Sequence, residues 1–347
     1  MREEMTPYDA ARRRAASADR ASRGTIVVTG ADRLTWLQGL LTNDITALER
    51  GNGCYAAWLT PQGRLITDMR VLSLADRLLL DIRAQDAAPL AERLDRLVFA
   101  EDAQIHDASA SIRPLRVAGP SAAEVVGRVL ADRSGGAAAA ALAGLASWPE
   151  YRGATIAASA PDEGGAGEIV VVRDDEWGVP GYDILAAPGI LSDIRNALAT
   201  RGVARLDEAS GETLRIEAGR PRFGVDMDTE TIPLEAGIED RAISFSKGCY
   251  VGQEVIVRVT TRGQGRVARR LVGLTIDGTR VPDRGEPIVA GDRDIGKVTS
   301  AAMSPAVGRP IALGYVHRDF SDPSTRVAIG GAAGEAAVVT SLPFTRA

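Results

Sequence analysis

The stretch CYAAWLTPQGRLITDMRVLSL, residues 54–74, predicts two β-strands joined by a tight turn. Aromatic and aliphatic residues recur in both halves, as in strands that pack one face against a core. Between the halves stands Pro61-Gln62-Gly63-Arg64, in which proline favours the first central turn position and glycine the last. We therefore expect strands at residues 54–60 and 65–74.

The sequence around this pair of strands completes an α+β sandwich. Residues 25–29 and 78–83 are further runs of strand-forming residues. Asp32 is expected to open a helix with Leu34, Leu37 and Leu41 on its apolar face. Asp86 is expected to cap a second helix, whose apolar face is Leu90, Leu94, Leu97 and Val98. Helices would then cover one face of the sheet.

Two further regions follow along the chain. Residues 113–204 start a second unit, which is broken by an alanine- and glycine-rich helix-and-loop region at 134–146 and by a loop at 162–167. We expect both breaks to be mobile and without function. A helix at 210–218 ends before Gly219. From Arg269 onward, short β-rich runs between glycines predict a small barrel. These runs are residues 271–276, 287–290, 295–300, 311–317, 327–329 and 337–341.

Composition limits the class of protein. With 347 residues, two or three domains are expected, and 45% hydrophobic with 25% charged residues is typical of a soluble globular protein. The first 20 residues lack the apolar core of a signal peptide, and no apolar run is long enough for a bilayer. Two distant cysteines suit a reducing cytoplasm, and two histidines make a protein-only zinc site unexpected. The net charge of −5 argues against a general nucleic-acid coat.

Asp68 is the first candidate site residue. It lies in the middle of a predicted strand, on the face that also carries Ile66, Leu72 and Leu74. A carboxylate on a mostly apolar face is costly unless it is paired or functional. Either a salt bridge to Arg70, two residues on, or a contact with a ligand would explain it.

The second candidate is Lys247-Gly248-Cys249-Tyr250-Val251-Gly252-Gln253-Glu254. If this segment is extended, Lys247 and Cys249 share one face. An ammonium so close would favour the thiolate of Cys249 and make it reactive. The alternative is that Cys249 is a small buried hydrophobic residue.

The octapeptide resembles the K-G-C-Y-x-G-Q-E signature of the YgfZ family, folate-binding relatives of the glycine-cleavage T protein. Four other stretches fit that resemblance in order: residues 36–44 (WLQGLLTND), 61–68 (PQGRLITD), 214–219 (LRIEAG) and 296–300 (GKVTS). They are shared with the wider T-protein superfamily. The resemblance implies three domains, two ferredoxin-like α/β sandwiches and a C-terminal β-barrel. The implied boundaries are 24–112 with 205–265, then 113–204, then 266–347.

The same resemblance implies a function and its partners. Such a protein binds tetrahydrofolate and supports the assembly or maintenance of iron–sulfur enzymes, including those that modify tRNA. Its partners would be folate, with or without a polyglutamate tail, and iron–sulfur client or assembly proteins; direct binding of tRNA is left open. The alternatives are a folate-dependent aminomethyltransferase, which needs no cysteine here, and a passive folate- or RNA-binding module.

Site roles follow from the resemblance residue by residue. Cys249 would be the reactive centre, Lys247 its electrostatic partner, and Asp68 the acid at the folate. Glu217 would bond the pterin edge, and Tyr250 would cover a pterin face. Each has a plainer reading, because a helix-end glutamate is usually solvated and a tyrosine is often core.

Five arginines form the last feature, within thirteen residues that contain no acid. They are Arg258, Arg262, Arg266, Arg269 and Arg270. They would guide the glutamate tail of folate or a phosphate backbone, or else form a solvated strand edge that deters edge pairing. Arg258, which adjoins the signature, would also line the folate site.

These assignments predict that Cys249 reacts faster with alkylating agents than Cys54, which begins an apolar strand. Pulsed alkylation followed by mass mapping measures both rates in the folded protein. Labelling of Cys54 first, or of both only on unfolding, would make Cys249 structural.

Overall fold

The computed structural model describes residues 5–158, 167–262, 265–331 and 333–345 of the chain. They form two compact units. The first consists of Met1–Ala56, Asp68–Asp175 and Val179–Glu208. The second consists of Ala57–Thr67, Glu176–Gly178 and Ala209–Ala347. The three-domain boundaries given above stay a prediction.

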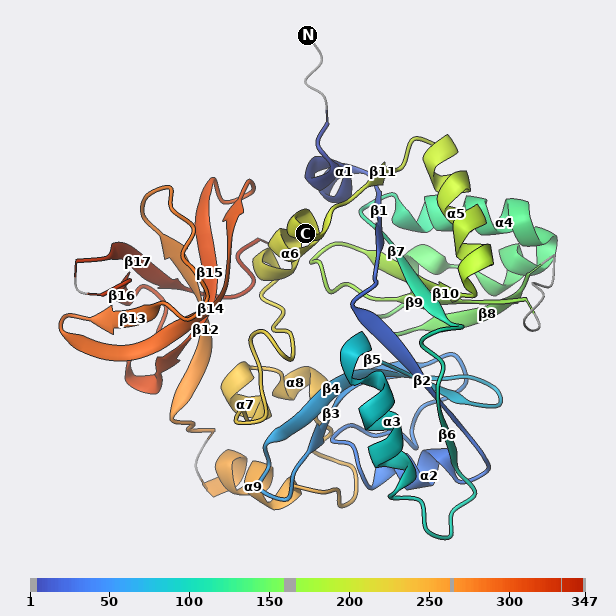
Figure 1. Cartoon of the computed structure of the whole chain (residues 1–347), viewed down its shortest axis with the longest axis horizontal. Coiled ribbons are helices and arrows are strands. Elements are labelled where there is room, and N and C mark those ends of the chain that lie inside the picture. The colour runs from blue at the N-terminus through green and yellow to red at the C-terminus, as the bar shows by residue number, and fades with distance from the viewer. Residues whose placement is uncertain (1–4, 159–166, 263–264, 332, 346–347) are drawn as a thin grey trace. The chain divides into compact units, whose positions relative to one another are not determined.

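A five-stranded sheet has the strand order β3-β4-β5-β2-β6 (Figure 1). Its strands are β2 (Arg23–Thr29), β3 (Gly53–Leu59), β4 (Leu65–Ser73), β5 (Leu78–Arg83) and β6 (Gln104–Asp107). β2 pairs antiparallel with β5 and β6, and β4 pairs antiparallel with β5. The strands predicted from alternation in this part of the chain are confirmed.

The helices beside this sheet are shorter than predicted. α2 (Arg33–Gln38) ends before Leu41, which is nevertheless buried. α3 (Ala87–Asp95) follows a 3₁₀ turn, Ala84–Asp86, and does not reach Leu97. Asp86 takes the N-cap position as expected, but its carboxylate does not bond the helix amides and accepts hydrogen bonds of 2.6 and 2.9 Å from Arg83 instead. The guanidinium outcompetes the helix amides for the carboxylate.

A second, six-stranded sheet has the order β11-β1-β7-β10-β9-β8. Its strands are β1 (Ala16–Asp19), β7 (Arg113–Ala118), β8 (Gly153–Ala157), β9 (Glu168–Arg173), β10 (Gly181–Ala186) and β11 (Ala204–Arg205). β1 runs parallel to β11 and antiparallel to β7. It follows α1 (Pro7–Arg13), in which Thr6 caps the helix by accepting from the Asp9 amide at 3.1 Å. The sequence analysis predicted neither α1 nor β1.

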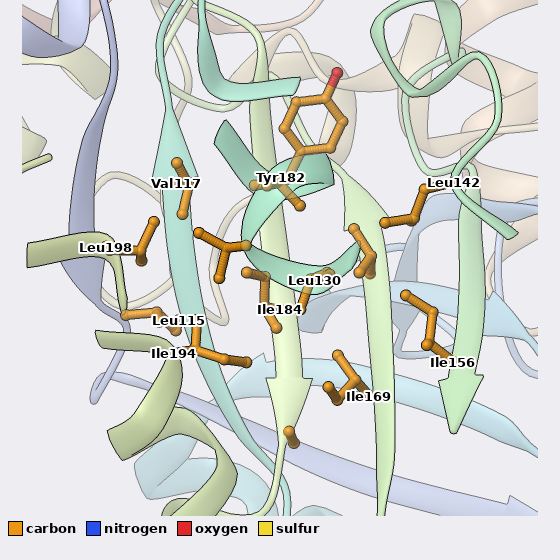
Figure 2. Close-up of a cluster of buried hydrophobic side chains, with 14 of the residues drawn as sticks. Leu115, Val117, Leu130, Leu142, Ile156, Ile169, Tyr182, Ile184, Ile194 and Leu198 are labelled. Carbon is orange, nitrogen blue, oxygen red and sulfur yellow. The ribbon is translucent and has the colours of Figure 1, made fainter. Parts of the chain in front are cut away.

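Two helices cover one face of the second sheet, α4 (Ala122–Ala141) and α5 (Pro188–Thr200) (Figure 1). Leu130 of α4 and Ile194 and Leu198 of α5 pack against Leu115 and Ile184 on the strands (Figure 2). The predicted helix-and-loop region at 134–146 is helical as far as Ala141, the end of α4, with a kink at Gly135 (φ 67°), and a 3₁₀ turn follows at Leu145–Ser147. The second predicted break, 162–167, lies mostly outside the described residues.

The opposite face of the second sheet packs on the five-stranded sheet, inside the first unit. Leu72 and Leu79 from one sheet meet Val170, Val172 and Leu185 from the other. Alternation explains the choice, because Tyr182 and Ile184 of β10 face the helices while Asp183 and Leu185 face the other sheet.

Charged side chains share this layer between the sheets. Arg116 is fully buried and donates to both oxygens of Asp183 at 2.8 and 2.9 Å. Arg70 donates to Asp183 at 2.7 Å and also bonds Asp81 and Asp174. Arg70 thus crosses from the five-stranded sheet to Asp174 and Asp183, whereas Arg116 pairs with the same two acids from within the second sheet.

The second unit contains a closed barrel with the strand order β12-β15-β14-β13-β16-β17 (Figure 1). Its strands are β12 (Arg269–Ile276), β13 (Pro287–Ala290), β14 (Arg293–Ser304), β15 (Arg309–His317), β16 (Arg326–Ile329) and β17 (Glu335–Thr340). Val272, Leu274 and Ile288 lie in its core, and Ile216 of α6 (Glu208–Glu217) packs on Ile311 and Leu313. The α+β class and the C-terminal barrel are confirmed.

Short helices complete the second unit: α7 (Pro233–Ala236), α8 (Glu239–Ala242), α9 (Gln253–Val257), a π-helical turn at Arg258–Arg262 and a 3₁₀ turn at Arg318–Phe320. Within the described part of the chain, every helix is too short or too polar to cross a lipid bilayer.

The buried charges predict a loss of stability in acid. Burial would raise the pKa of Asp183, but Arg116 and Arg70 outweigh it and lower the pKa to about 2. The unfolded chain takes up this proton near its ordinary value of 3.8, so the contribution is present above that pH and is lost as pH falls toward 2. The expected loss is about 2 kcal/mol.

Hydrogen exchange of the β7 and β10 amides, followed between pH 5 and pH 2.5, measures this loss. Asp183→Asn should destabilise the unit at pH 7 by about 3 kcal/mol or more and flatten the acid dependence. Asp193→Asn is the control, since the Asp193 side chain is 61% exposed and its ion pair with Arg133 should contribute under about 1 kcal/mol. An unchanged acid slope in Asp183→Asn contradicts the assignment.

Candidate functional site

Asp68 lies in the middle of β4 and is half-buried. The Tyr55 hydroxyl, from neighbouring β3, donates to its carboxylate at 2.7 Å. Tyr55 itself is buried. The sequence analysis missed this partner, for which the pairing of the two strands around the Pro61–Arg64 turn is the only signal.

A salt bridge between Asp68 and Arg70, the plainer explanation of Asp68, stays a prediction. Arg70 bonds Asp81, Asp174 and Asp183. The negative charge of Asp68 is among those that act on Arg23 of β2. Asp68 therefore stands at the margin of the charged layer between the two sheets.

The signature octapeptide forms a loop that enters α9. The Lys247 ammonium lies 5.2 Å from the centre of the Tyr250 ring, a cation–π contact. Tyr250 is 9% exposed, and burial raises the pKa of its phenol to about 12. Cys249 is exposed, whereas Cys54 is half-buried. This difference in exposure has the direction expected if Cys249 is the more accessible thiol.

Two glycines hold the signature loop against the β3–β4 turn, within the second unit. Gly252 has φ +85°, and a Cβ there would lie 2.5 Å from the Thr60 backbone oxygen. Gly63 has φ +74°, and a Cβ there would lie 2.8 Å from Cβ of Val255. Any side chain at either position would force the two segments apart. The two motifs that the sequence analysis singled out are thus in contact.

Glu217 ends α6 and is fully buried. The Ser304 hydroxyl of β14 donates to one of its carboxylate oxygens, and the Phe344 amide donates to its backbone oxygen at 2.8 Å. The expectation of a solvated helix end is therefore wrong. The contact of Glu217 with a pterin stays a proposal. It would require the carboxylate to accept a hydrogen bond from the pterin in addition to the one from Ser304.

A buried network next to Glu217 explains two of the shared motifs. Arg215 donates to Asp226 at 2.7 Å and to the Ser300 hydroxyl at 2.8 Å. Thr299 and Ser300 each donate to Asp226 at 2.6 Å. Burial alone would lower the pKa of Arg215, but Asp226 and Glu212 raise it. These motif residues fix α6 and the following segment to the barrel.

The arginine cluster divides into separate environments. Arg258 is exposed in the π-helical turn, and the side chain of Arg262 lies outside the described residues. Arg269 is committed to the protein, with Glu235 at 3.1 Å and the Tyr315 ring centre at 4.6 Å. Arg266 and Arg270 line an open hollow of about 610 Å³ together with Arg318, Asp319 and Asp322. Acids in this hollow offset part of its positive charge.

Metal binding was not expected from the sequence. Among the described residues, no three histidine, cysteine or carboxylate side chains gather closely enough to hold a metal ion.

Comparison with known proteins places this geometry in a family. The GCVT N-terminal domain matches residues 4–150, and the glycine cleavage T-protein C-terminal barrel domain matches residues 269–345. An aminomethyltransferase of Streptomyces avermitilis is 30% identical over 99% of this chain and 90% of its own length. One of Streptomyces coelicolor is 29% identical over 98% of this chain and 89% of its own length.

A solved structure has the same fold. The glycine cleavage system aminomethyltransferase T from Bartonella henselae superposes with a TM-score of 0.84 at 23% identity, covering 98% of this chain and 89% of that one. These matches extend over both units, from the N-terminal sheets to the barrel. The chain therefore belongs to the glycine cleavage T-protein superfamily.

Proposed function

We propose that this protein binds tetrahydrofolate and carries out a folate-dependent aminomethyl transfer of the T-protein type. The observation that carries the proposal is Asp68, a half-buried carboxylate in the middle of β4 that accepts a hydrogen bond from Tyr55 at 2.7 Å. It stands in a chain that full-length relatives named aminomethyltransferase match over 98–99% of its residues. The aminomethyltransferase alternative of the sequence analysis thus has more support than the iron–sulfur role placed first there.

Asp68 has the acceptor capacity that a pterin requires. A carboxylate accepts up to about four hydrogen bonds, and the Tyr55 hydroxyl uses one of them. Pterin amine and ring N–H groups are donors that carboxylates satisfy. The Tyr55 hydroxyl fixes one oxygen in place, and the lone pairs of the carboxylate would accept hydrogen bonds or a proton from the ligand.

The remaining proposed contacts are more restricted. Tyr250 would meet folate only through the ring face that Lys247 does not cover. Glu217 would contribute through the carboxylate that Ser304 already bonds. Arg258, Arg266 and Arg270 are exposed, and they would pair with the carboxylates of a glutamate tail.

A second candidate function is support of iron–sulfur enzymes by a YgfZ-like protein. One observation favours it: Cys249 is exposed in the signature loop. This loop packs closely on the β3–β4 turn through Gly252 of the loop and Gly63 of the turn. Aminomethyl transfer has no need of a thiol at this position. An iron–sulfur role would make Cys249 the reactive group and Lys247 its neighbour.

Loss of the Asp68 carboxylate should weaken binding of tetrahydrofolate. A hydrogen bond to a charged group is worth ~1.5–3 kcal/mol, so Asp68→Ala should lower affinity by roughly ten- to a hundredfold. Aminomethyl transfer from a lipoyl carrier protein should fall at least as far. Calorimetric titration and a single-turnover transfer assay measure the two effects.

Asp76→Asn is the matched control for Asp68→Ala. Asp76 is an aspartate of the same unit, its side chain is 70% exposed, and it pairs with Arg77 at 3.0 Å. Its substitution should leave both measurements unchanged. Equal titration curves for wild type and Asp68→Ala would overturn the proposed site.

The thiol distinguishes the two candidate functions. If aminomethyl transfer is the function, Cys249→Ser should keep full transfer activity, because Cys249 is exposed, serine has the same side-chain shape and no thiol chemistry is required. If the iron–sulfur role applies, the same variant should fail to restore iron–sulfur enzyme activities in a deletion strain. Cys54→Ser serves as the control in both assays.

A further inference from the structure

Glu217 ends α6 at a point where the main chain is fixed by a later segment of the same unit. Its backbone oxygen accepts a hydrogen bond from the Phe344 amide at 2.8 Å. Leu342 and Phe344 belong to the apolar cluster around Ile216. Gly219 has φ +65°, and a Cβ there would lie 2.8 Å from Cβ of Leu342. The main chain at Glu217 is therefore held without the help of its carboxylate, and the direction of the carboxylate is left to be fixed.

Ser304, the last residue of β14, fixes that direction. It is fully buried, and its hydroxyl donates to Oε1 of Glu217 while accepting the Val307 amide at 3.0 Å. An amide can only donate, so the Val307 hydrogen occupies a lone pair of the Ser304 oxygen. The hydroxyl hydrogen is then turned toward Glu217, whose oxygen is the acceptor.

The Val307 amide belongs to the hairpin that joins β14 to β15. Ser304 pairs with Arg309 across this hairpin, and the Gly308 amide donates to the Ser304 backbone oxygen at 2.8 Å. Gly308 has φ +74°, a conformation that other residues rarely adopt. Val307 itself packs in the apolar cluster around Ile216. Folding of the barrel thus sets the direction of the Ser304 hydroxyl.

We propose that Ser304 is a positioning residue, which holds the Glu217 carboxylate in one orientation as a hydrogen-bond acceptor. A carboxylate removed from water is costly unless donors reach it, and Ser304 supplies a donor from the barrel. The carboxylate cannot turn without breaking that bond. A ligand that meets a group already oriented loses less affinity to the freezing of a side chain.

This inference rests on the proposed function only for its consequence at the ligand. The amine and ring N–H groups of a pterin would meet an acceptor whose direction is set before binding. The orientation of Glu217 is itself a property of the free protein. It can therefore be tested with and without folate.

The first test compares crystal structures of ligand-free wild type and Ser304→Ala. Without the hydroxyl, the Glu217 carboxylate should turn away from its wild-type position or occupy several orientations, while the main chain of α6 stays in place. Thr275→Val is the matched control, because it removes a side-chain hydrogen bond of 2.7 Å to Thr340 from the same barrel. This variant should retain the wild-type orientation of Glu217.

The second test is titration with tetrahydrofolate. Ser304→Ala should lower affinity roughly tenfold. In Glu217→Met, whose side chain is of similar length and apolar, the same change should alter affinity by less than about twofold, because Ser304 acts through Glu217. If Ser304 served only the hairpin, its loss would weaken binding equally in both backgrounds.

The outcomes separate this inference from the proposed function. An unchanged orientation of Glu217 in Ser304→Ala overturns the inference even if the protein binds tetrahydrofolate. Equal losses of affinity in the two backgrounds overturn it as well. A turned carboxylate in a protein that does not bind tetrahydrofolate supports the inference and removes the proposed function. Ser304→Ala should fold, because the Gly308 amide still bonds the backbone oxygen at position 304 and β14 keeps its pairing with β15.

Discussion

The first unit depends on the layer where its two sheets meet, because hydrocarbon and charge alternate there along each strand. Leucines and valines fill one part, and Arg70, Arg116 and their aspartates fill the other. Buried ion pairs add little net stability, but breaking one is costly. A shift of β10 by one residue would turn Asp183 into the apolar core under α4 and α5 and would turn Tyr182 toward the arginines. The charges therefore fix register, while the hydrocarbon supplies most of the cohesion.

The sequence predicted those parts of the fold that local pattern determines. Alternation predicted β2, β3, β4 and β5 of the first sheet and the strands of the barrel, and glycine positions predicted the barrel turns and the end of α6. Asp68 was found because a carboxylate on an apolar strand face breaks the pattern. The charged layer beside Asp68 could not be predicted, since Asp174 and Asp183 lie 104 and 113 residues along the chain from their partner Arg70. No periodicity says which strands of two sheets face each other.

Other differences have the same origin in competition between partners. Asp86 was assigned to a helix cap, but Arg83 offers two charge-assisted bonds in place of one amide. The plainer reading of Glu217 as a solvated helix end is wrong, because its side chain is buried and accepts a hydrogen bond from a serine 87 residues away. Among the site residues, those in the signature and Asp68 came from sequence. Tyr55 did not, because its hydroxyl contact depends on the geometry of two strands after folding.

The N-terminal strand has a consequence for any shortened form of this protein. β1 has only four residues and lies between β7 and β11, so it fills the middle of an otherwise interrupted row of main-chain hydrogen bonds. A chain beginning after residue 20 would leave one edge of β7 without its neighbour. Such an edge recruits strands from other molecules. Proteolytic trimming within the first 20 residues should therefore convert a monomeric preparation into one that self-associates, although every proposed site residue would still be present.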